Sequence, residues 1–180
     1  MQTGSERRHF ESLALTDPLT GLYNRGAFEE RAHIAVRQAI RERSPVAVIM
    51  VDLDCFKPYN DNYGHAAGDR VLEAVAAALS PHFRRSMDLV ARIGGEEFAG
   101  LCFGVSLESA QQIGVDLVER VAALNIEHRS SLVATTITAS VGVHYAEPRL
   151  GQTLALLLQQ ADAALYAARR EGRNRAVVTR

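Results

Sequence analysis

The nine residues that say most about the fold are Arg92-Ile93-Gly94-Gly95-Glu96-Glu97-Phe98-Ala99-Gly100. Apolar, strand-like segments lie on both sides, and the Gly94-Gly95 connection predicts a β-hairpin because tight hairpin turns need residues with positive φ. Side chains alternate along a strand, so Glu96 and Glu97 are expected to point in different directions, and we assign Glu96 to face an ion. This stretch alone leaves two interpretations open: an ordinary hairpin with a solvated acidic edge, and a phosphate and metal site.

The composition of the whole chain is typical of one soluble globular domain. It has 180 residues, 47% hydrophobic and 23% charged, and a formal net charge of -1. Without a basic field, the chain is not expected to bind nucleic acid. No apolar run approaches the ~20 residues of a membrane helix, so no direct membrane insertion by this chain is expected. Cys55 and Cys102 lack metal-ligand spacing and no signal peptide is recognisable, which favours a cytoplasmic location.

Hydrophobic periodicity predicts an α/β (α+β) protein in which helices alternate with strands around one sheet. Helices are expected over residues 26–43, 69–79, 107–124 and 153–171, and strands over residues 46–53, 89–93, 98–103, 133–145 and 176–179. Residues 54–68 are expected to form a loop. The polar residues 1–15 have too few large apolar side chains for a core and are expected to form a linker.

Acidic residues at the end of a predicted strand indicate a cation site. Asp52 and Asp54 end the valine-rich strand over residues 46–53. Beside the hairpin carboxylates, Asp52 would suffer like-charge repulsion unless a cation neutralised the group. Magnesium suits such a site, because it prefers oxygen ligands and is usually held by one or two carboxylates together with substrate phosphates. The alternative for Asp52 alone is an aspartate that caps a loop.

Several motifs occur in the order of one known family. They are Asp17-Pro18-Leu19-Thr20-Gly21-Leu22-Tyr23-Asn24-Arg25, Asp52-Leu53-Asp54-Cys55-Phe56-Lys57, Asn60-Asp61 with Gly64-His65 and Gly68-Asp69, Gly94-Gly95-Glu96-Glu97-Phe98, Ser140-Val141-Gly142, and Ala161-Asp162 through Tyr166 to Gly172-Arg173-Asn174. With these motifs the chain resembles the GGDEF-domain diguanylate cyclases, which join two GTP molecules into cyclic di-GMP and release pyrophosphate. The resemblance covers residues 17–178 and implies a central, mostly antiparallel sheet flanked by helices, as in nucleotidyl cyclases and polymerase palm domains. It assigns residues 16–180 to the domain and residues 1–15 to a linker helix or tail.

The resemblance also implies roles for the acidic and basic residues. Asp52, the Leu53 carbonyl and Glu96 would bind Mg²⁺, or Mn²⁺, and Glu96 would accept the proton of the ribose 3′-hydroxyl. Glu97 would join a second ion. Catalytic Lys57 would contact phosphate, although most single lysines are simply solvated. The other expected phosphate-side residues are Gly94, Gly95, Arg169 and Arg173, with Arg92 a weaker candidate.

Base recognition is assigned by the resemblance to Asn60, Asp69 and His65. The Asp69 carboxylate can accept hydrogen bonds from the N1–H and the exocyclic amine of guanine, whereas adenine presents an acceptor at N1. Guanine is therefore the expected base. The alternatives are that Asp69 caps its helix and that residues 60–64 form only a turn.

A product-inhibition site is implied by Arg85 and Asp88, an Arg-x-x-Asp pair placed before the hairpin as in the family. An exposed ion pair, worth about 0 to 1 kcal/mol, is the alternative. Where some relatives place a further arginine, this chain has Asp116, with Arg120 one turn on. The strength of inhibition is therefore left open.

The expected activity needs two copies of the domain, because each bound GTP attacks the other. The resemblance thus implies a homodimer, with an upstream sensor or signalling domain as a further partner. The rival interpretation is a catalytically silent module that binds GTP or cyclic di-GMP and signals through a partner. The presence of Asp52, Lys57, Glu96 and Glu97 argues against a silent module. A generic nucleotide-binding domain would not explain the ordered motifs.

Overall fold

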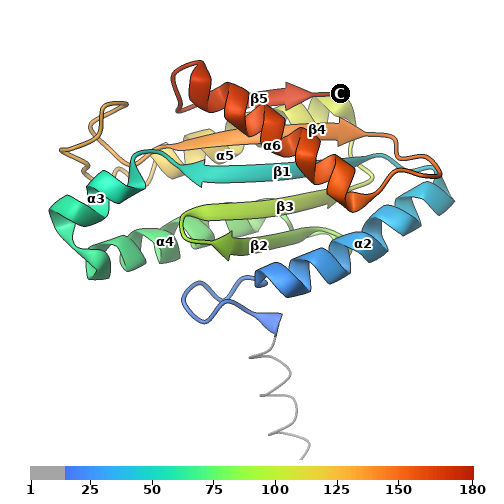
Figure 1. Cartoon of the computed structure of the whole chain (residues 1–180), viewed down its shortest axis with the longest axis horizontal. Helices are drawn as coiled ribbons and strands as arrows, with labels where there is room; N and C mark the ends of the chain where they lie inside the picture. Colours follow the sequence, from blue (N-terminus) through green and yellow to red (C-terminus); the bar gives the residue numbers. More distant parts are fainter. Residues whose placement is uncertain (1–14) are drawn as a thin grey trace, which may run out of the picture.

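The computed structural model describes residues 15–180, which form a five-stranded sheet with helices on both faces (Figure 1). The predicted linker over residues 1–15 lies, apart from Leu15, outside the described residues. The elements are α2 (Arg25–Glu42), β1 (Val46–Leu53), α3 (Phe56–Tyr63), α4 (His65–Leu79), the 3-10 helix η1 (Ser80–His82), β2 (Leu89–Gly94), β3 (Glu97–Phe103), α5 (Leu107–Ala122), β4 (Ala139–Ala146), α6 (Leu154–Arg170) and β5 (Ala176–Thr179).

The sheet has the strand order β2-β3-β1-β4-β5, and only the last pair, β4 with β5, is parallel. The expectation of a mostly antiparallel sheet is therefore confirmed. Central strand β1 is buried along its whole length, as its valine-rich sequence predicts for a strand covered on both faces. In the β1–β3 register, Asp52 lies opposite Glu97, so the end of β1 and the start of β3 meet at the same end of the sheet.

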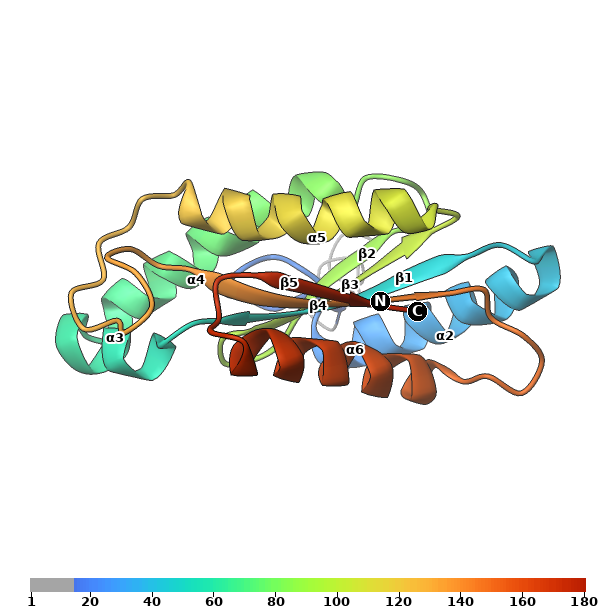
Figure 2. The ribbon, with the colours of Figure 1, turned by 90° about the horizontal axis from the view of Figure 1, so that it is seen from above.

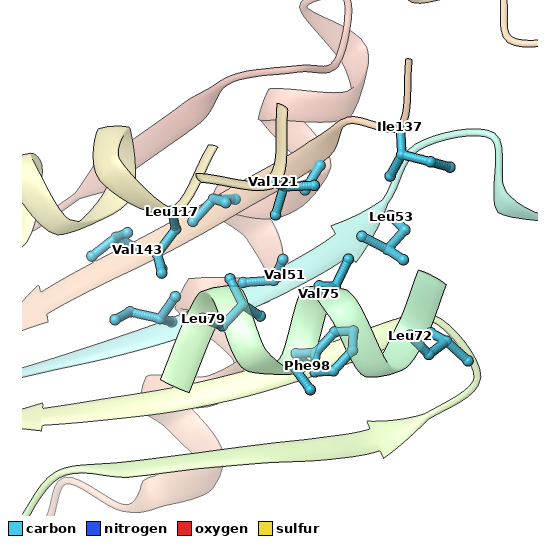
Figure 3. Close-up of a cluster of buried hydrophobic side chains, with 14 of the residues drawn as sticks. Val51, Leu53, Leu72, Val75, Leu79, Phe98, Leu117, Val121, Ile137 and Val143 are labelled. Atoms are coloured by element: carbon cyan, nitrogen blue, oxygen red, sulfur yellow. The ribbon is translucent and has the colours of Figure 1, made fainter. Parts of the chain in front are cut away.

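Two helical layers enclose the sheet (Figure 2). Helices α4 and α5 cover one face and α2 and α6 cover the other, each with a cluster of buried apolar side chains beneath it. In the first cluster, Leu79 of α4, Leu117 of α5 and Val51 of β1 point toward one another between helix and sheet (Figure 3). Removal of this apolar surface from water is the main stabilising term of the fold.

Gly142 explains how closely α6 lies on the sheet. A Cβ atom at this position of β4 would come within 2.2 Å of the Leu165 backbone nitrogen and 2.4 Å of the Ala161 carbonyl oxygen. Both neighbours are helix backbone and cannot move aside. The glycine of the Ser140-Val141-Gly142 motif thus lets α6 contact β4 directly, which fixes the position of the last turn of α6 at the end of the sheet.

The predictions for residues 54–69 differ from the structure. Residues 56–63 form helix α3 rather than a loop, because Phe56 and Tyr59 bury one face and Pro58 falls in the first turn, where no backbone N–H is needed. Helix α4 begins at His65 instead of residue 69, so Asp69 lies inside the helix and does not cap it. The proposed turn over residues 60–64 is likewise wrong.

The predicted strand over residues 133–145 begins only at Ala139. The residues before it fold back on their own chain: the Ile137 amide donates to the Ile126 carbonyl and the His128 amide donates to the Thr135 carbonyl. The hairpin turn is also displaced by one residue, since Gly94 still belongs to β2 and the register shifts between Arg92 and Gly94. Within residues 15–180, no helix is long and apolar enough to cross a membrane.

Candidate active site

Four segments from three distant parts of the sequence meet at one end of the sheet (Figure 1). They are the end of β1, the β2–β3 hairpin, helix α3 and the turn after α6. Two adjoining cavities lie among them. The first, called here the phosphate cavity, has a volume of about 280 Å³ and is lined by Asp52, Leu53, Asp54, Cys55, Phe56, Lys57, Pro58, Glu96, Arg169 and Arg173. The second, the base cavity, has a volume of about 430 Å³ and is lined by Phe56, Lys57, Asn60, Asp61, His65, Asp69, Leu72, Arg92, Gly95 and Glu96.

Asp52 is the buried carboxylate of the phosphate cavity, with 7% of its surface exposed. Its Oδ2 atom lies 3.3 Å from Nη1 of Arg169, whereas its buried Oδ1 atom has no hydrogen-bond partner in the described part of the chain. Burial raises the pKa of Asp52 to about 6; Arg169 opposes this effect, and Glu96 and Glu97 add to it. The charged form is therefore under-stabilised by the protein alone.

These features fit a bound cation. Residues 15–180 contain no group of three or more His, Cys, Asp and Glu side chains close enough to hold a metal ion by themselves. The available donors would be Asp52, Glu96 and the Leu53 carbonyl, and two carboxylates with one carbonyl is the small protein share typical of Mg²⁺ sites that substrate phosphates complete. A cation would also give the unpaired Asp52 Oδ1 atom a partner and reduce the repulsion among the carboxylates.

Asp54 lies two residues from Asp52 and has a different environment. Its Oδ1 atom accepts a hydrogen bond from Ser140 Oγ at 2.7 Å, and its Oδ2 atom accepts from Thr138 Oγ1 at 2.8 Å and from the Asn174 amide at 3.0 Å. Although it borders the cavity, this carboxylate is fully used in joining β1, β4 and the turn after α6. Asp54 therefore supports the site and is a poor metal ligand.

The turn after α6 brings Arg173 to the phosphate cavity through an unusual backbone. Arg173 and Asn174 have φ values of 65° and 48°, in the left-handed region that non-glycine residues rarely adopt. Such residues cost on the order of 1–2 kcal/mol each and persist when the surrounding structure holds them. Here the hydrogen bond from the Asn174 amide to Asp54 holds the turn, which keeps Arg173 beside Asp52 and Arg169.

Glu96 and Lys57 line both cavities. Glu96 lies in the hairpin turn, half-buried, and its carbonyl accepts a hydrogen bond from the Leu53 amide at 3.3 Å; Glu97, at the start of β3, is exposed. Glu96 and Glu97 were expected to point in different directions as neighbours on one strand. In the structure Glu96 lies in a turn and Glu97 lies in a strand. Lys57 is largely exposed and its Nζ atom lies 2.9 Å from Oδ2 of Asp61. An exposed pair of this kind contributes at most about 1 kcal/mol, so Lys57 can exchange partners readily.

The base cavity holds the three predicted base-reading residues, Asn60 of α3 and His65 and Asp69 of α4. The Asn60 Oδ1 atom is buried without a partner among the described residues. Asp69 and His65 are exposed. Any discrimination by Asp69 between guanine and adenine therefore does not depend on a carboxylate that is already buried in the free protein.

Gly68 does not line this cavity but lies directly against the Asn60 side chain, and it had been assigned no role from the sequence. A Cβ atom there would lie 1.8 Å from Asn60 Oδ1 and 2.9 Å from its Cγ. Glycine is therefore required if the Asn60 side chain is to keep its place, and the Gly68-Asp69 pair in the motif was the available signal.

The hairpin is braced by a contact that local sequence does not reveal. Arg92 donates from Nε to the Gly95 carbonyl at 2.8 Å and from Nη1 to Asp17 Oδ1 at 3.2 Å. The other oxygen of Asp17 accepts from the amide and the hydroxyl of Thr20. Arg92, a weak phosphate candidate in the sequence, is thus engaged in holding the hairpin turn. The Asp17 motif has a structural purpose, which is to support the turn that carries Glu96.

Residues 14–175 match the model of a protein family described as "Diguanylate cyclase, GGDEF domain". The chain belongs to the GGDEF domain family. It is 39% identical over 162 residues to the diguanylate cyclase DgcP of Pseudomonas aeruginosa, an alignment that covers 90% of this chain and 23% of DgcP. The GGDEF domain thus spans about a quarter of that relative's length.

Solved GGDEF structures share the fold. The coiled coil and GGDEF domain of DgcB from Caulobacter crescentus, in complex with c-di-GMP, superposes with a TM-score of 0.86 at 31% identity, covering 97% of this chain and 92% of that chain. The diguanylate cyclase SiaD from Pseudomonas aeruginosa, in complex with its activator SiaC, has a TM-score of 0.83 at 35% identity and covers 97% of this chain and 65% of that chain.

The predicted product site of this GGDEF domain lies outside the two cavities. The Asp88 carboxylate accepts from the Arg85 amide at 3.2 Å and from the Phe103 amide at 3.1 Å, so it stabilises the chain between η1 and β2. Among the ion pairs of residues 15–180, none joins the Arg85 and Asp88 side chains. The proposed surface ion pair is therefore not formed, and binding of product by Arg85 stays a prediction. Asp116 accepts a hydrogen bond from Gln112 at 2.8 Å.

Proposed function

We propose that this GGDEF domain is a diguanylate cyclase that condenses two GTP molecules into cyclic di-GMP. One observation carries the proposal: the residues predicted to read guanine and most of those predicted to bind phosphates and Mg²⁺ line two adjoining cavities, which share Phe56, Lys57 and Glu96. A nucleoside triphosphate needs this division between base and phosphates. The sugar would then lie at the junction, beside Glu96.

Each cavity has the chemistry of its part of GTP. In the base cavity, Asn60 has an unused buried acceptor, and Asp69 can accept from the two guanine donors that adenine lacks. In the phosphate cavity, Arg169 and Arg173 supply planar cationic groups that bind phosphate through two hydrogen bonds. Lys57 would leave Asp61 and turn toward the triphosphate.

In the proposed reaction, the ribose 3′-oxygen of one GTP attacks the α-phosphorus of the other. A P–O bond forms, the bond between the α-phosphorus and the oxygen bridging to the β-phosphate breaks, and pyrophosphate leaves; the same exchange on the second GTP closes the ring. Glu96 accepts the hydroxyl proton, and Lys57, Arg169 and Arg173 offset the charge that develops on the phosphates. A bound Mg²⁺, held by Asp52, Glu96 and the Leu53 carbonyl, would lower the hydroxyl pKa and polarise the α-phosphate.

The reaction requires a homodimer, since one domain presents one GTP and two must face each other. The chain spans about a quarter of DgcP, so sensing and partner binding belong to the proposal as well. SiaD is in complex with an activator. We propose that this domain, too, is controlled by a sensor or activator that brings two copies together in the cytoplasm.

The test is incubation of the purified chain with GTP and Mg²⁺, followed by anion-exchange chromatography of the nucleotides. Cyclic di-GMP and pyrophosphate should appear, at a specific rate that rises with protein concentration. Glu96→Gln should bind GTP and form no product, whereas the matched change Glu30→Gln, at an exposed position of α2, should behave as the wild type. Binding of GTP or cyclic di-GMP without turnover at any concentration would instead support the silent module.

A further inference from the structure

The segment over residues 127–131 lies against α3 and contacts neither cavity. It makes three hydrogen bonds to the turn and helix that follow β1, across more than 60 residues of sequence. His128 Nε2 is 2.8 Å from the Cys55 carbonyl oxygen, Ser130 Oγ donates to the Pro58 carbonyl at 3.1 Å, and the Arg129 amide donates to Tyr63 Oη at 3.0 Å. We call residues 127–131 the clamp segment. Its irregular backbone is what allows these contacts.

His128 is the buried centre of the clamp segment, with 1% of its surface exposed. A carbonyl oxygen only accepts, so the Nε2 atom of His128 must carry the proton and donate to Cys55. The imidazole ring also meets the Tyr59 ring edge-on, with 5.2 Å between centroids, and Tyr59 stacks on Tyr63 at 4.5 Å. One side chain thus fixes the helix by a hydrogen bond and by a ring contact.

Helix α3 depends on such outside support. It has eight residues, fewer than an isolated helix needs to be stable in water. Its N-cap residue, Cys55, has a φ of 54° and makes no side-chain capping bond. The clamp segment is itself tied back, because the His128 amide donates to the Thr135 carbonyl at 2.8 Å. It therefore acts as a fixed support for a short helix with a strained first residue.

Helix α3 forms the wall that the two cavities share. It carries Lys57, which lines both cavities, and Asn60, which lines the base cavity. The Leu53 carbonyl precedes the same turn by two residues. A small displacement of α3 would consequently change the site at three points, one in each of its predicted tasks: cation binding, phosphate contact and base reading.

We propose that His128 is a positioning residue for the nucleotide site: its hydrogen bond to the Cys55 carbonyl holds α3, and with it Lys57 and Asn60, in the geometry that binds the triphosphate. The inference rests on the proposed function, and it adds a residue that touches neither substrate nor metal. Because Ser130 makes a parallel bond to Pro58, the loss of His128 should loosen α3 without unfolding the domain.

The test compares two variants of the whole chain. His128→Phe keeps a ring against Tyr59 and removes the donor, whereas His128→Gln keeps an N–H donor near the Nε2 position and removes the ring. The first measurement is amide hydrogen exchange of residues 55–63, with α2 as the internal control. The second is calorimetric binding of 3′-deoxy-GTP with Mg²⁺, a probe that lacks the attacking hydroxyl and cannot turn over.

His128→Phe should exchange faster over residues 55–63 and bind 3′-deoxy-GTP about fivefold more weakly, the effect of one hydrogen bond, with α2 unchanged. His128→Gln should stay within about twofold of the wild type in both measurements. If hydrogen exchange over residues 55–63 is unchanged in His128→Phe, His128 does not hold α3. If exchange is faster but the affinity for 3′-deoxy-GTP is unchanged, His128 holds α3 without positioning the nucleotide site. Weakening in His128→Gln alone would assign the effect to the ring contact and overturn the role of the hydrogen bond. Equal weakening in both variants would show that the donor alone does not hold α3, which overturns that role as well. If the wild type fails to bind 3′-deoxy-GTP, the proposed function fails and the positioning role with it, while hydrogen exchange still decides whether the clamp exists.

Discussion

Two groups of polar residues at this end of the sheet use their side chains in opposite ways. Asp52 and Asn60 line the cavities and are called the floor. Asp54 and Asp17 with their hydrogen-bond partners, together with the Cys55–His128 contact, support the surrounding segments and are called the polar frame. On the floor, Asp52 Oδ1 and Asn60 Oδ1 are buried and have no partner among residues 15–180. In the frame, Asp54 and Asp17 each accept three hydrogen bonds from the protein. Buried polar atoms are nearly always paired in stable proteins. The unpaired atoms thus indicate where a ligand belongs, and the paired ones indicate what keeps the site in shape.

The largest effect should separate the two aspartates by activity. Asp52→Asn weakens the proposed cation site and should lower the rate of cyclic di-GMP formation at least about 100-fold, since metal stabilisation of the transition state is worth several kcal/mol. Asp54→Asn should stay within about tenfold, because its amide can still accept from Asn174 and Thr138 and donate to Ser140. Initial rates at saturating GTP and Mg²⁺ measure both. Equal losses would mean that the chemistry uses both carboxylates.

The effects of the two aspartates on stability should have the reverse order, with Asp54 contributing more than Asp52. Asp54→Ala removes the acceptor for three buried or part-buried donors and should lower the free energy of unfolding by about 3 kcal/mol or more. Asp52→Asn should not lower it. Urea denaturation without divalent cations provides the measurement. An Asp54→Ala variant as stable as the wild type would show that the frame can be dispensed with.

The pH dependence of stability should also distinguish Asp52. Its pKa, raised to about 6 by burial, lies above the value in the unfolded chain, so the folded state binds more protons between the two values and loses stability as the pH rises through this window. At pH 8 the Asp52→Asn variant should therefore be more stable than the wild type by up to about 3 kcal/mol, and the difference should vanish near pH 3. Denaturation curves at both pH values check this. A difference independent of pH would contradict it.

A smaller effect is expected from Gly68→Ala, which acts on the floor. The added methyl group must displace the Asn60 amide, and one lost base contact should weaken 3′-deoxy-GTP binding about tenfold, by analogy with the cost of a lost contact to a base edge. Gly26→Ala is the matched control in α2, where the new Cβ would lie at an ordinary distance of 3.7 Å from Asn24 Oδ1. Titration calorimetry measures the affinity of each variant for 3′-deoxy-GTP. Equal affinities would show that Asn60 does not read the base.

The smallest effect on catalysis is expected at the predicted product site. The carboxylate oxygens of Asp88 accept from the Arg85 and Phe103 amides and stabilise the chain before β2, which leaves the Arg85 guanidinium for a ligand. Arg85→Ala should leave the initial rate within about twofold and weaken binding of cyclic di-GMP by the value of a charged hydrogen bond, roughly tenfold. Titration calorimetry with cyclic di-GMP measures the latter. Overlaid progress curves and equal affinities would assign no product binding to Arg85.

The sequence predicted most of what depends on local pattern. The valine-rich strand β1, the hairpin and the amphipathic helices follow from periodicity and glycine chemistry. Most of the residues expected to share a site line one of two adjoining cavities, although Gly94 and Glu97 line neither. Their roles stay predictions. Helix α3 was missed because it is short and contains Pro58 and several turn-forming residues, so its stability comes from tertiary contacts. Residues 133–138 were assigned to a strand, but Thr135 and Ile137 pair with residues of the preceding loop and Thr138 pairs with Asp54.

The polar frame could not be predicted for a different reason. The partners Asp54–Asn174, Asp17–Arg92 and Cys55–His128 are separated by more than 70 residues, and no spacing rule connects them. The ion pair between Asp52 and Arg169 was missed as well: both residues were assigned to ligands, metal for one and phosphate for the other. Sequence motifs indicated which residues touch a ligand more clearly than how those residues are held.

That ion pair has a consequence for the order in which ligands are accepted. Arg169 serves Asp52 as an internal counter-ion at 3.3 Å. A free divalent cation would have to compete with the Arg169 guanidinium for Asp52 and would leave the guanidinium without a counter-ion. A cation that arrives with a triphosphate would instead offer Arg169 a phosphate group in exchange. In the proposed function, metal and nucleotide would therefore strengthen each other's binding by the same factor, as linkage requires. The domain would bind free divalent cations weakly and bind the metal–nucleotide complex more strongly.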